Sequence, residues 1–396
     1  MRAPRALAFA VVLVAVLAAG LWLGGHPQVL PEPLRDVFVE EPAGLVGEAA
    51  EAIEDSYYRP VGEKELGNAS LQGMVRELRR RHDDRFTEYF SPESLESFNQ
   101  QIEGRFSGIG LSVVEVKRGL RVAEVFPRSP AAEAGIEVGD TVVSVEGESI
   151  AGVNSTEATK KIKGPEGTEV AIGVRDGKTG KVRELTLVRA EVTLPNVSSR
   201  IERVNGTQLG YVRLLTFSEE AHAQLGRAVE KVQEEGAEGI VLDLRHNPGG
   251  LLGEAVRSAS LFLPEGEVVV TTESRSQGES THETGDGRIT SLPLVVLIDR
   301  GTASAAEILT AALADNGDAA VVGTRSFGKG VFQEEQPLAN GGALKLTVGE
   351  YFTPNGVNLA ESRGIHPDVK VKDVPRSKGD EVEARGFEVL AKKVGS

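Results

Sequence analysis

Residues 292–307 read LPLVVLIDRGTASAAE and combine a buried strand with the start of a helix. Residues 294–299 are a continuous apolar run ending in an acid, typical of a strand buried on both faces. Residues 302–313 are rich in Ala and Leu at helical spacing, so a helix is expected to begin near residue 303. Ser304 would then lie in its first turn, where free N–H groups and the helix dipole favour a developing negative charge. A capping serine is the alternative explanation of the same position.

Strands and helices alternate from residue 190 to residue 373. Besides residues 294–299, the apolar runs at 239–244 and 319–323 predict short buried strands, and helices are expected between them. Such alternation predicts a largely parallel sheet, whose ligand sites lie beyond the carboxyl ends of the strands. Because a loop rich in glycine or polar residues follows each strand, we expect the three loops to meet at one edge of the sheet.

Composition limits the classes of function. The chain has 396 residues, enough for two or three domains, and a formal net charge of −15. The acidic balance argues against a nucleic-acid partner, which requires a basic face. The absence of cysteine excludes disulfides, Cys-based zinc sites and thiol nucleophiles. We expect no metal.

Residues 323–329, GTRSFGK, match the pattern of a phosphate-binding loop after a strand. Residue 330, however, is glycine, where such a loop needs Ser or Thr to hold magnesium. The following residues contain Pro337 and no helical pattern. We therefore expect neither nucleotide binding nor any other cofactor.

The amino-terminal residues have the composition of a targeting segment. Two arginines precede residues 6–25, which carry no charge and have about the length that crosses a bilayer. We expect residues 1–25 to be an uncleaved anchor that holds the protein in the cell membrane as a single-pass protein, with the catalytic part extracytoplasmic. A cleaved signal peptide and a secreted protein are the alternative. Residues 26–103 are expected to form a linker and a helical arm, with helices over 43–57, 63–82 and 92–103.

Residues 104–189 change to short β runs with two short helices. GIGL at residues 108–111, SPAAEAGI at 129–136 and GDTVVSVEGESI at 139–150 together resemble a PDZ domain of the bacterial type. In such a domain a peptide adds itself as an extra strand, and backbone N–H groups of a glycine loop hold its terminal carboxylate. A structural β-domain without a ligand is the alternative. The residues expected to bind the peptide are Gly108, Ile109, Gly110, Leu111, Ala158 and Ile162.

A serine nucleophile needs a base, and Lys329 is the candidate we favour. It lies in a Gly-Lys-Gly sequence after a buried strand, and Ser–Lys pairs are a known nucleophile–base arrangement. The reference pKa of lysine is about 10.4, so work near neutrality requires a depression of roughly two to three units, which burial can supply. Gln333 would orient the neutral amine. A surface lysine is the simpler alternative, and His246 is the alternative base.

Acyl transfer also needs donors for the oxyanion. The backbone N–H of Ala305, directly after Ser304, is one candidate. Gly249 or Gly250 is expected to provide the second, with Pro248 fixing the loop.

Three segments follow the PDZ-like region in a fixed order: DLRHNPGG at 243–250, GTASAAE at 301–307 and VVGTRSFGKGVFQ at 321–333. Together they resemble the C-terminal processing (tail-specific) peptidases, over about residues 90–372. The family pattern reads GSASASE, and Thr302 and Ala306 replace its outer two serines, neither of which is the nucleophile. The resemblance implies a serine endopeptidase that forms an acyl-enzyme, with Ser304 as nucleophile, Lys329 as general base and Gln333 as its orienting partner.

The expected fold is therefore α/β and multidomain, with N-terminal helices, a PDZ β-domain at 104–189 and an α/β protease core at 190–373. The expected function is capture of protein C-terminal tails by the PDZ domain and their cleavage at Ser304. The alternative function is that of a catalytically silent, membrane-anchored PDZ adaptor. Residues 374–396 are expected to form a C-terminal helix and tail, in which a helix over 381–394 joins the N-terminal helices in a homodimer.

Overall fold

The computed structural model describes residues 41–194, 196–317, 319–372 and 379–395. The chain divides into two compact units, residues 1–91 and 92–396. The first unit contains α3 (Glu41–Ser56), α4 (Glu63–His82) and β1 (Glu88–Phe90). None of the described helices has the length and apolarity that a bilayer crossing requires. The anchor expected at residues 1–25 lies outside the described residues.

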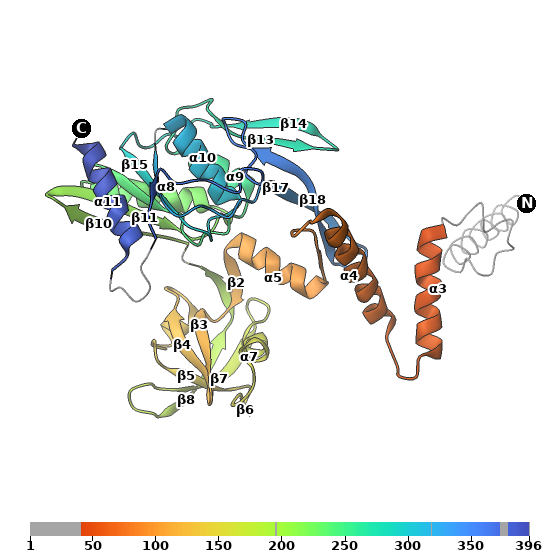
Figure 1. The fold of residues 1–396 in the computed structure, drawn as a ribbon. Coiled ribbons are helices and arrows are strands. Elements are labelled where there is room, and N and C mark those ends of the chain that lie inside the picture. Colours follow the sequence, from red (N-terminus) through yellow and green to blue (C-terminus); the bar gives the residue numbers. More distant parts are fainter. Residues whose placement is uncertain (1–40, 195, 318, 373–378, 396) are drawn as a thin grey trace, which may run out of the picture. The chain divides into compact units, whose positions relative to one another are not determined.

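The second unit begins with α5 and a PDZ module (Figure 1). The module has its own apolar core. Its antiparallel sheet has the strand order β3-β4-β5-β7-β8, and β6 pairs with β5. A short ribbon of β2 and β9 closes the module at the point where the chain enters and leaves it. The elements are α5 (Pro92–Glu103), β2 (Arg105–Gly108), β3 (Leu111–Val116), β4 (Gly119–Val125), α6 (Pro130–Glu133), β5 (Thr141–Val145), β6 (Glu148–Ser149), α7 (Ser155–Ile162), β7 (Glu169–Arg175), β8 (Val182–Val188) and β9 (Ala190–Thr193).

The rest of the unit is the α/β core that the alternation of strands and helices predicts. Its main sheet has the order β10-β11-β12-β15-β16-β19. The strands from β11 to β19 are parallel, and only the edge strand β10 in this sheet is antiparallel to its neighbour. The elements of this layer are β10 (Val197–Val204), β11 (Thr207–Leu214), α8 (Ala221–Glu234), β12 (Ile240–Asp243), α9 (Leu252–Ser260), β15 (Leu294–Ile298), α10 (Ala305–Gly317), β16 (Ala320–Gly323), β19 (Val369–Lys370) and α11 (Glu381–Val394).

Strand β15 is apolar throughout because both faces of the sheet are covered. Val296 and Ile298 belong to the apolar cluster that contains residues of α8, α9 and α10. Val295 and Leu297 belong to a second cluster, formed with α11. A strand buried on both sides gains free energy from every apolar side chain, which explains the unbroken run in the sequence.

A second, antiparallel sheet was not foreseen. Within this unit its strands lie in the order β14-β13-β18-β17. Helix α10 is buried along its first nine residues, since its apolar cluster also includes residues of β13 and β18. The strands are β13 (Val268–Ser274), β14 (Gly278–Glu283), β17 (Val331–Pro337) and β18 (Ala343–Phe352).

Helix α11, dark blue in Figure 1, forms where the sequence predicts it. Its apolar residues Val382, Phe387 and Leu390 pack on the main sheet of the same chain. We expected this face to meet the N-terminal helices of a second copy, and that expectation is wrong because the face is already buried within the chain.

Candidate active site

The three loops singled out in the sequence follow β12, β15 and β16, and they meet at one edge of the sheet. The N–H of Ala303 donates to the Asn247 carbonyl at 3.0 Å, which joins the first loop to the second. The N–H of Phe327 donates to the Thr302 carbonyl at 2.9 Å, which joins the third loop to the second. Parallel strands place their carboxyl ends together, and these bonds hold the loops in contact there.

Ser304 lies immediately before α10, one residue outside the first turn in which we expected it. Its φ angle is 55°, in the left-handed region, which costs a non-glycine residue roughly 1–3 kcal/mol. The serine hydroxyl meets the Tyr351 hydroxyl at 3.1 Å. A capping serine would instead accept a bond from the helix N–H groups. The geometry therefore favours a presented hydroxyl over a simple cap.

Glu307 is the buried centre of the site, and its side chain is completely inaccessible to solvent. Its Oε2 atom accepts the N–H of Ser304 and the N–H of Lys329, each at 2.9 Å. Its Oε1 atom accepts the N–H of Gly328 at 2.7 Å and the Ser326 hydroxyl at 2.5 Å. A carboxylate that accepts several hydrogen bonds fixes its donors in place. One side chain thus ties the Ser304 loop to the Lys329 loop.

Lys329 is partly buried, and its amine has an unusual acidity. Burial, as the main cause, lowers its pKa to about 8, and the positive charge of Lys345 lowers it further. The negative charge of Glu307 acts in the opposite direction. A substantial fraction of the amine is therefore neutral in the mildly alkaline range, as a general base requires.

Gln333 lies on β17, and its amide donates to Thr347 Oγ1 on β18 at 3.3 Å. This bond fixes the amide within the antiparallel sheet. The structure thus gives Gln333 a defined partner on β18.

Of the two glycines after β12, Gly249 lies directly against Ser304, whereas a Cβ atom added at Gly250 would meet the backbone of Phe217. A Cβ atom added at Gly249 would lie 2.8 Å from Ser304 Cβ and 2.9 Å from the Ala305 nitrogen. The Gly249 N–H itself donates to Asn247 Oδ1 at 2.9 Å. Among the described residues, the N–H groups of Gly250 and Ala305 have no protein acceptor.

His246 is paired elsewhere. Its Nδ1 atom lies 2.9 Å from Asp299 Oδ2, and its side chain is 74% exposed. Its backbone N–H also donates to Asp299. The imidazole therefore links the loops after β12 and β15.

The PDZ module has a small cavity of about 30 Å³ beside the start of β3. Its lining includes five of the six residues expected to bind a peptide: Gly108, Ile109, Gly110, Leu111 and Ile162. Ala158 is fully buried in the core of the module, and Thr159 takes its place in the lining.

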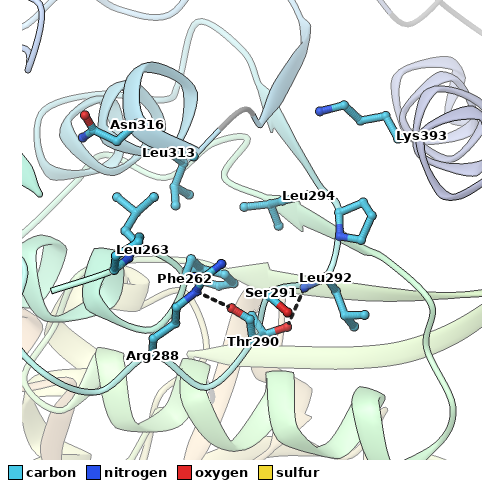
Figure 2. A pocket seen from close by; sticks show the side chains of 13 residues that line it. Phe262, Leu263, Arg288, Thr290, Ser291, Leu292, Leu294, Leu313, Asn316 and Lys393 are labelled. Atoms are coloured by element: carbon cyan, nitrogen blue, oxygen red, sulfur yellow. Dashed lines mark hydrogen bonds between the residues drawn. The ribbon is translucent and has the colours of Figure 1, made fainter. Parts of the chain in front are cut away.

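A larger cavity of about 450 Å³ lies elsewhere in the core (Figure 2). Its lining includes Leu294 at the start of β15 and Asn316 near the end of α10. Ser304 lies between the end of β15 and the start of α10, so the cavity belongs to the opposite edge of the sheet. Arg288, labelled in Figure 2, donates from Nε to the Thr290 carbonyl at 3.0 Å. None of the predicted site residues lines this cavity.

Sequence reasoning assigned no role to Glu307 or Tyr351. Glu307 stands three residues after Ser304, the spacing at which an acid reaches back to the N–H before a helix, so the capping pattern was a usable signal. Tyr351 meets Ser304 across 47 residues, and no local pattern predicts such a contact.

Comparisons with known proteins agree with this architecture. Peptidase family S41 matches residues 208–371, and the PDZ domain matches residues 97–175. The carboxy-terminal processing protease CtpA of Bacillus subtilis is 31% identical over 368 residues, which cover 92% of this chain and 77% of that protein. A probable CtpA-like serine protease of Staphylococcus saprophyticus is 32% identical, over 83% of this chain and 65% of that protein.

A solved structure of a putative S41 protease from Bacteroides fragilis has the same fold. Its TM-score is 0.51 at 19% sequence identity, over 87% of this chain and 96% of that one. With its PDZ module and its α/β core, the chain belongs to peptidase family S41, as a hydrolase of the serine-type, C-terminal processing group.

Proposed function

We propose that the protein is a serine endopeptidase in which Ser304 is the nucleophile and Lys329 is the general base. The observation that carries this proposal is the shared carboxylate oxygen of Glu307, which accepts the N–H groups of both residues at 2.9 Å. The pKa of Lys329, lowered by burial to about 8, supports the role of base. Gln333 would help to hold the β17 side of the site around the neutral amine.

In the proposed reaction the neutral Lys329 amine removes the hydroxyl proton of Ser304 as Oγ attacks the peptide carbonyl. The resulting ammonium returns that proton to the leaving amine, and an acyl-enzyme ester remains on Ser304. Water then attacks the ester, with Lys329 again accepting and returning one proton. Each half-reaction thus leaves the lysine as it began.

The oxyanion of the tetrahedral intermediate needs two donors near Ser304. The N–H groups of Ala305 and Gly250 are suited to this role because no described acceptor occupies them. Gly249, whose own N–H is engaged by Asn247, would contribute by leaving space beside Ser304. Preformed donors of this kind each contribute about 10²–10³-fold in rate.

The PDZ module would supply the substrate. A protein tail would add as a strand beside β3, with its carboxylate at the backbone of residues 108–111 and its last side chain near Ile162. The name of the Bacillus subtilis relative, carboxy-terminal processing protease, favours a tail as substrate.

The protein's location and assembly are also matters of proposal. The charge-free residues 6–25 favour a single-pass membrane anchor with the core extracytoplasmic. Exposed apolar side chains on α3 and α4, among them Leu45, Ile53 and Met74, favour a homodimer through the first unit. Retention in washed membranes would test the anchor. Mass photometry of wild type and of a Leu45→Ser, Ile53→Ser variant would test the dimer.

The central experiment is cleavage of a test protein that carries an apolar C-terminal tail. We expect cleavage by the wild type, and a loss of at least about 10³-fold in Ser304→Ala and in Lys329→Met. Equal cleavage by all three proteins would contradict the proposal. Tail binding by the wild type without any cleavage would favour a silent PDZ adaptor instead.

A further inference from the structure

Tyr351, on β18, contacts both of the segments that carry the proposed catalytic pair. Its hydroxyl donates to Ser304 Oγ at 3.1 Å. Its backbone N–H donates to the carbonyl of Gly330, the residue after Lys329, at 3.0 Å. The side chain is 2% exposed, and its ring lies nearly parallel to that of Phe332, with 6.5 Å between the centroids.

From this geometry we infer that Tyr351 is a further catalytic residue. Its phenol hydroxyl donates a hydrogen bond to Ser304 Oγ, which fixes that oxygen and directs the serine proton away from the tyrosine. The inference rests on the proposed role of Ser304 as nucleophile. It goes beyond the serine and lysine pair, because it assigns a further group that touches the reacting oxygen.

The direction of the hydrogen bond decides what the tyrosine can do. Burial, the main cause, raises the pKa of Tyr351 above its ordinary value. The phenol therefore keeps its proton throughout the working range and acts as a donor. A serine oxygen that accepts this bond still has its own proton, which is left to point at another acceptor. Lys329 is the proposed acceptor.

The proton balance of the reaction is unchanged by this role. The serine proton passes to the Lys329 amine and then to the leaving amine, while the phenol proton stays on Tyr351. During attack the phenol bond stabilises the negative charge that develops on Oγ, and it fixes the side-chain rotamer of Ser304. Both effects act on the chemical step and neither acts on the binding of the tail.

Packing alone does not require the hydroxyl. Phenylalanine at position 351 would keep the ring beside Phe332 and would keep the backbone bond to Gly330. It would remove only the bond to Ser304. Burying a hydroxyl costs free energy unless the group has a hydrogen-bond partner, and here that partner is the proposed nucleophile, Ser304.

The test compares Tyr351→Phe with the wild type in steady-state cleavage of the tailed protein and in labelling by a serine-directed phosphonate. We expect kcat and the labelling rate to fall about ten- to a hundredfold, with KM within about twofold. The acid limb of the pH profile should stay where it is in the wild type, since Lys329 governs it. A purely structural tyrosine would leave kcat and the labelling rate of the folded variant unchanged.

Tyr211→Phe is the matched control for folding. Tyr211 is also buried, and its hydroxyl donates to Asp243 at 2.6 Å, so its loss measures what a missing buried tyrosine bond does to the melting temperature. If Ser304→Ala abolishes cleavage while folded Tyr351→Phe keeps wild-type kcat and labelling, this inference fails and the proposed function stands. If cleavage does not depend on Ser304, both fail.

Discussion

Glu307 Oε2 accepts the backbone N–H of Lys329 at 2.9 Å, across 22 residues of sequence. The same carboxylate reaches back to Ser304 and forward to Ser326 and Gly328. Its position next to the nucleophile loop is fixed by α10, on which it occupies the third residue. A buried carboxylate is stable only while hydrogen-bond donors surround it. The Glu307 side chain therefore holds the Ser304 and Lys329 loops in place, and the two loops hold the carboxylate in place.

Glu307→Gln should disturb this arrangement while preserving side-chain size. The amide has one acceptor oxygen and turns an NH₂ group toward donors, which leaves at least one buried N–H unsatisfied at about 1–3 kcal/mol. We expect the free energy of unfolding to fall by about that amount and kcat to fall at least about tenfold. Urea denaturation and steady-state cleavage measure the two effects. Glu230→Gln, at an exposed position of α8, is the control, and equal behaviour of the two variants would contradict the assigned role.

The pH dependence of activity should report Lys329. Because its pKa is lowered to about 8, the neutral base is the minor form at pH 7 and the major form at pH 9. The value of kcat/KM should therefore rise about tenfold over this interval. A rise centred near about pH 6–7 would indicate a histidine base and would contradict the assignment.

The variant Lys345→Gln tests the direction in which the pH profile should shift. The positive charge of Lys345 disfavours the Lys329 ammonium, so its removal should raise the pKa of Lys329. The acid limb of the profile should then move to higher pH, because a smaller fraction of Lys329 would be neutral at pH 7. Lys392→Gln, an exposed change on α11, should leave the profile in place. A limb that moves to lower pH in Lys345→Gln would show that the sign is wrong.

Much of the core was predictable because its signals are local. The apolar runs that became β12, β15 and β16 have few alternatives to strands buried on both faces, and the loops that follow them had to meet. The antiparallel sheet was missed because its edge strand β14 is largely exposed and carries no apolar alternation. Tyr351 was missed because its contact with Ser304 depends on the position of β18 in the second sheet, which no local pattern predicts.

Gly249→Ala should abolish activity through steric contact. The new Cβ would lie 2.8 Å from Ser304 Cβ and 2.9 Å from the Ala305 nitrogen, and the φ of 96° is unfavourable for alanine. We expect kcat to fall by more than about a hundredfold. Gly253→Ala, on α9, is the matched control because its Cβ would meet its nearest neighbour at 3.6 Å. Retention of wild-type activity by Gly249→Ala would refute the crowded geometry beside Ser304.

The PDZ module should recognise the free carboxylate of the tail. Amidation of that carboxylate removes the charge that the N–H groups of residues 108–111 would bind. We expect KM to rise at least about tenfold with kcat nearly unchanged, because the lost interaction is the same in the ground and transition states. Identical KM values for tails that end in a carboxylate and in an amide would exclude carboxylate recognition by the PDZ module.

The central claim is that Ser304 becomes covalently acylated in a step that Lys329 drives. Rapid acid quench of wild-type enzyme with tailed substrate, followed by intact-mass and peptide mapping, measures this directly. The account predicts an ester adduct of the amino-terminal product on Ser304, formed in the wild type and absent from Ser304→Ala and Lys329→Met. Cleavage that proceeds with no adduct on Ser304, or an adduct that forms equally fast in Lys329→Met, would contradict it.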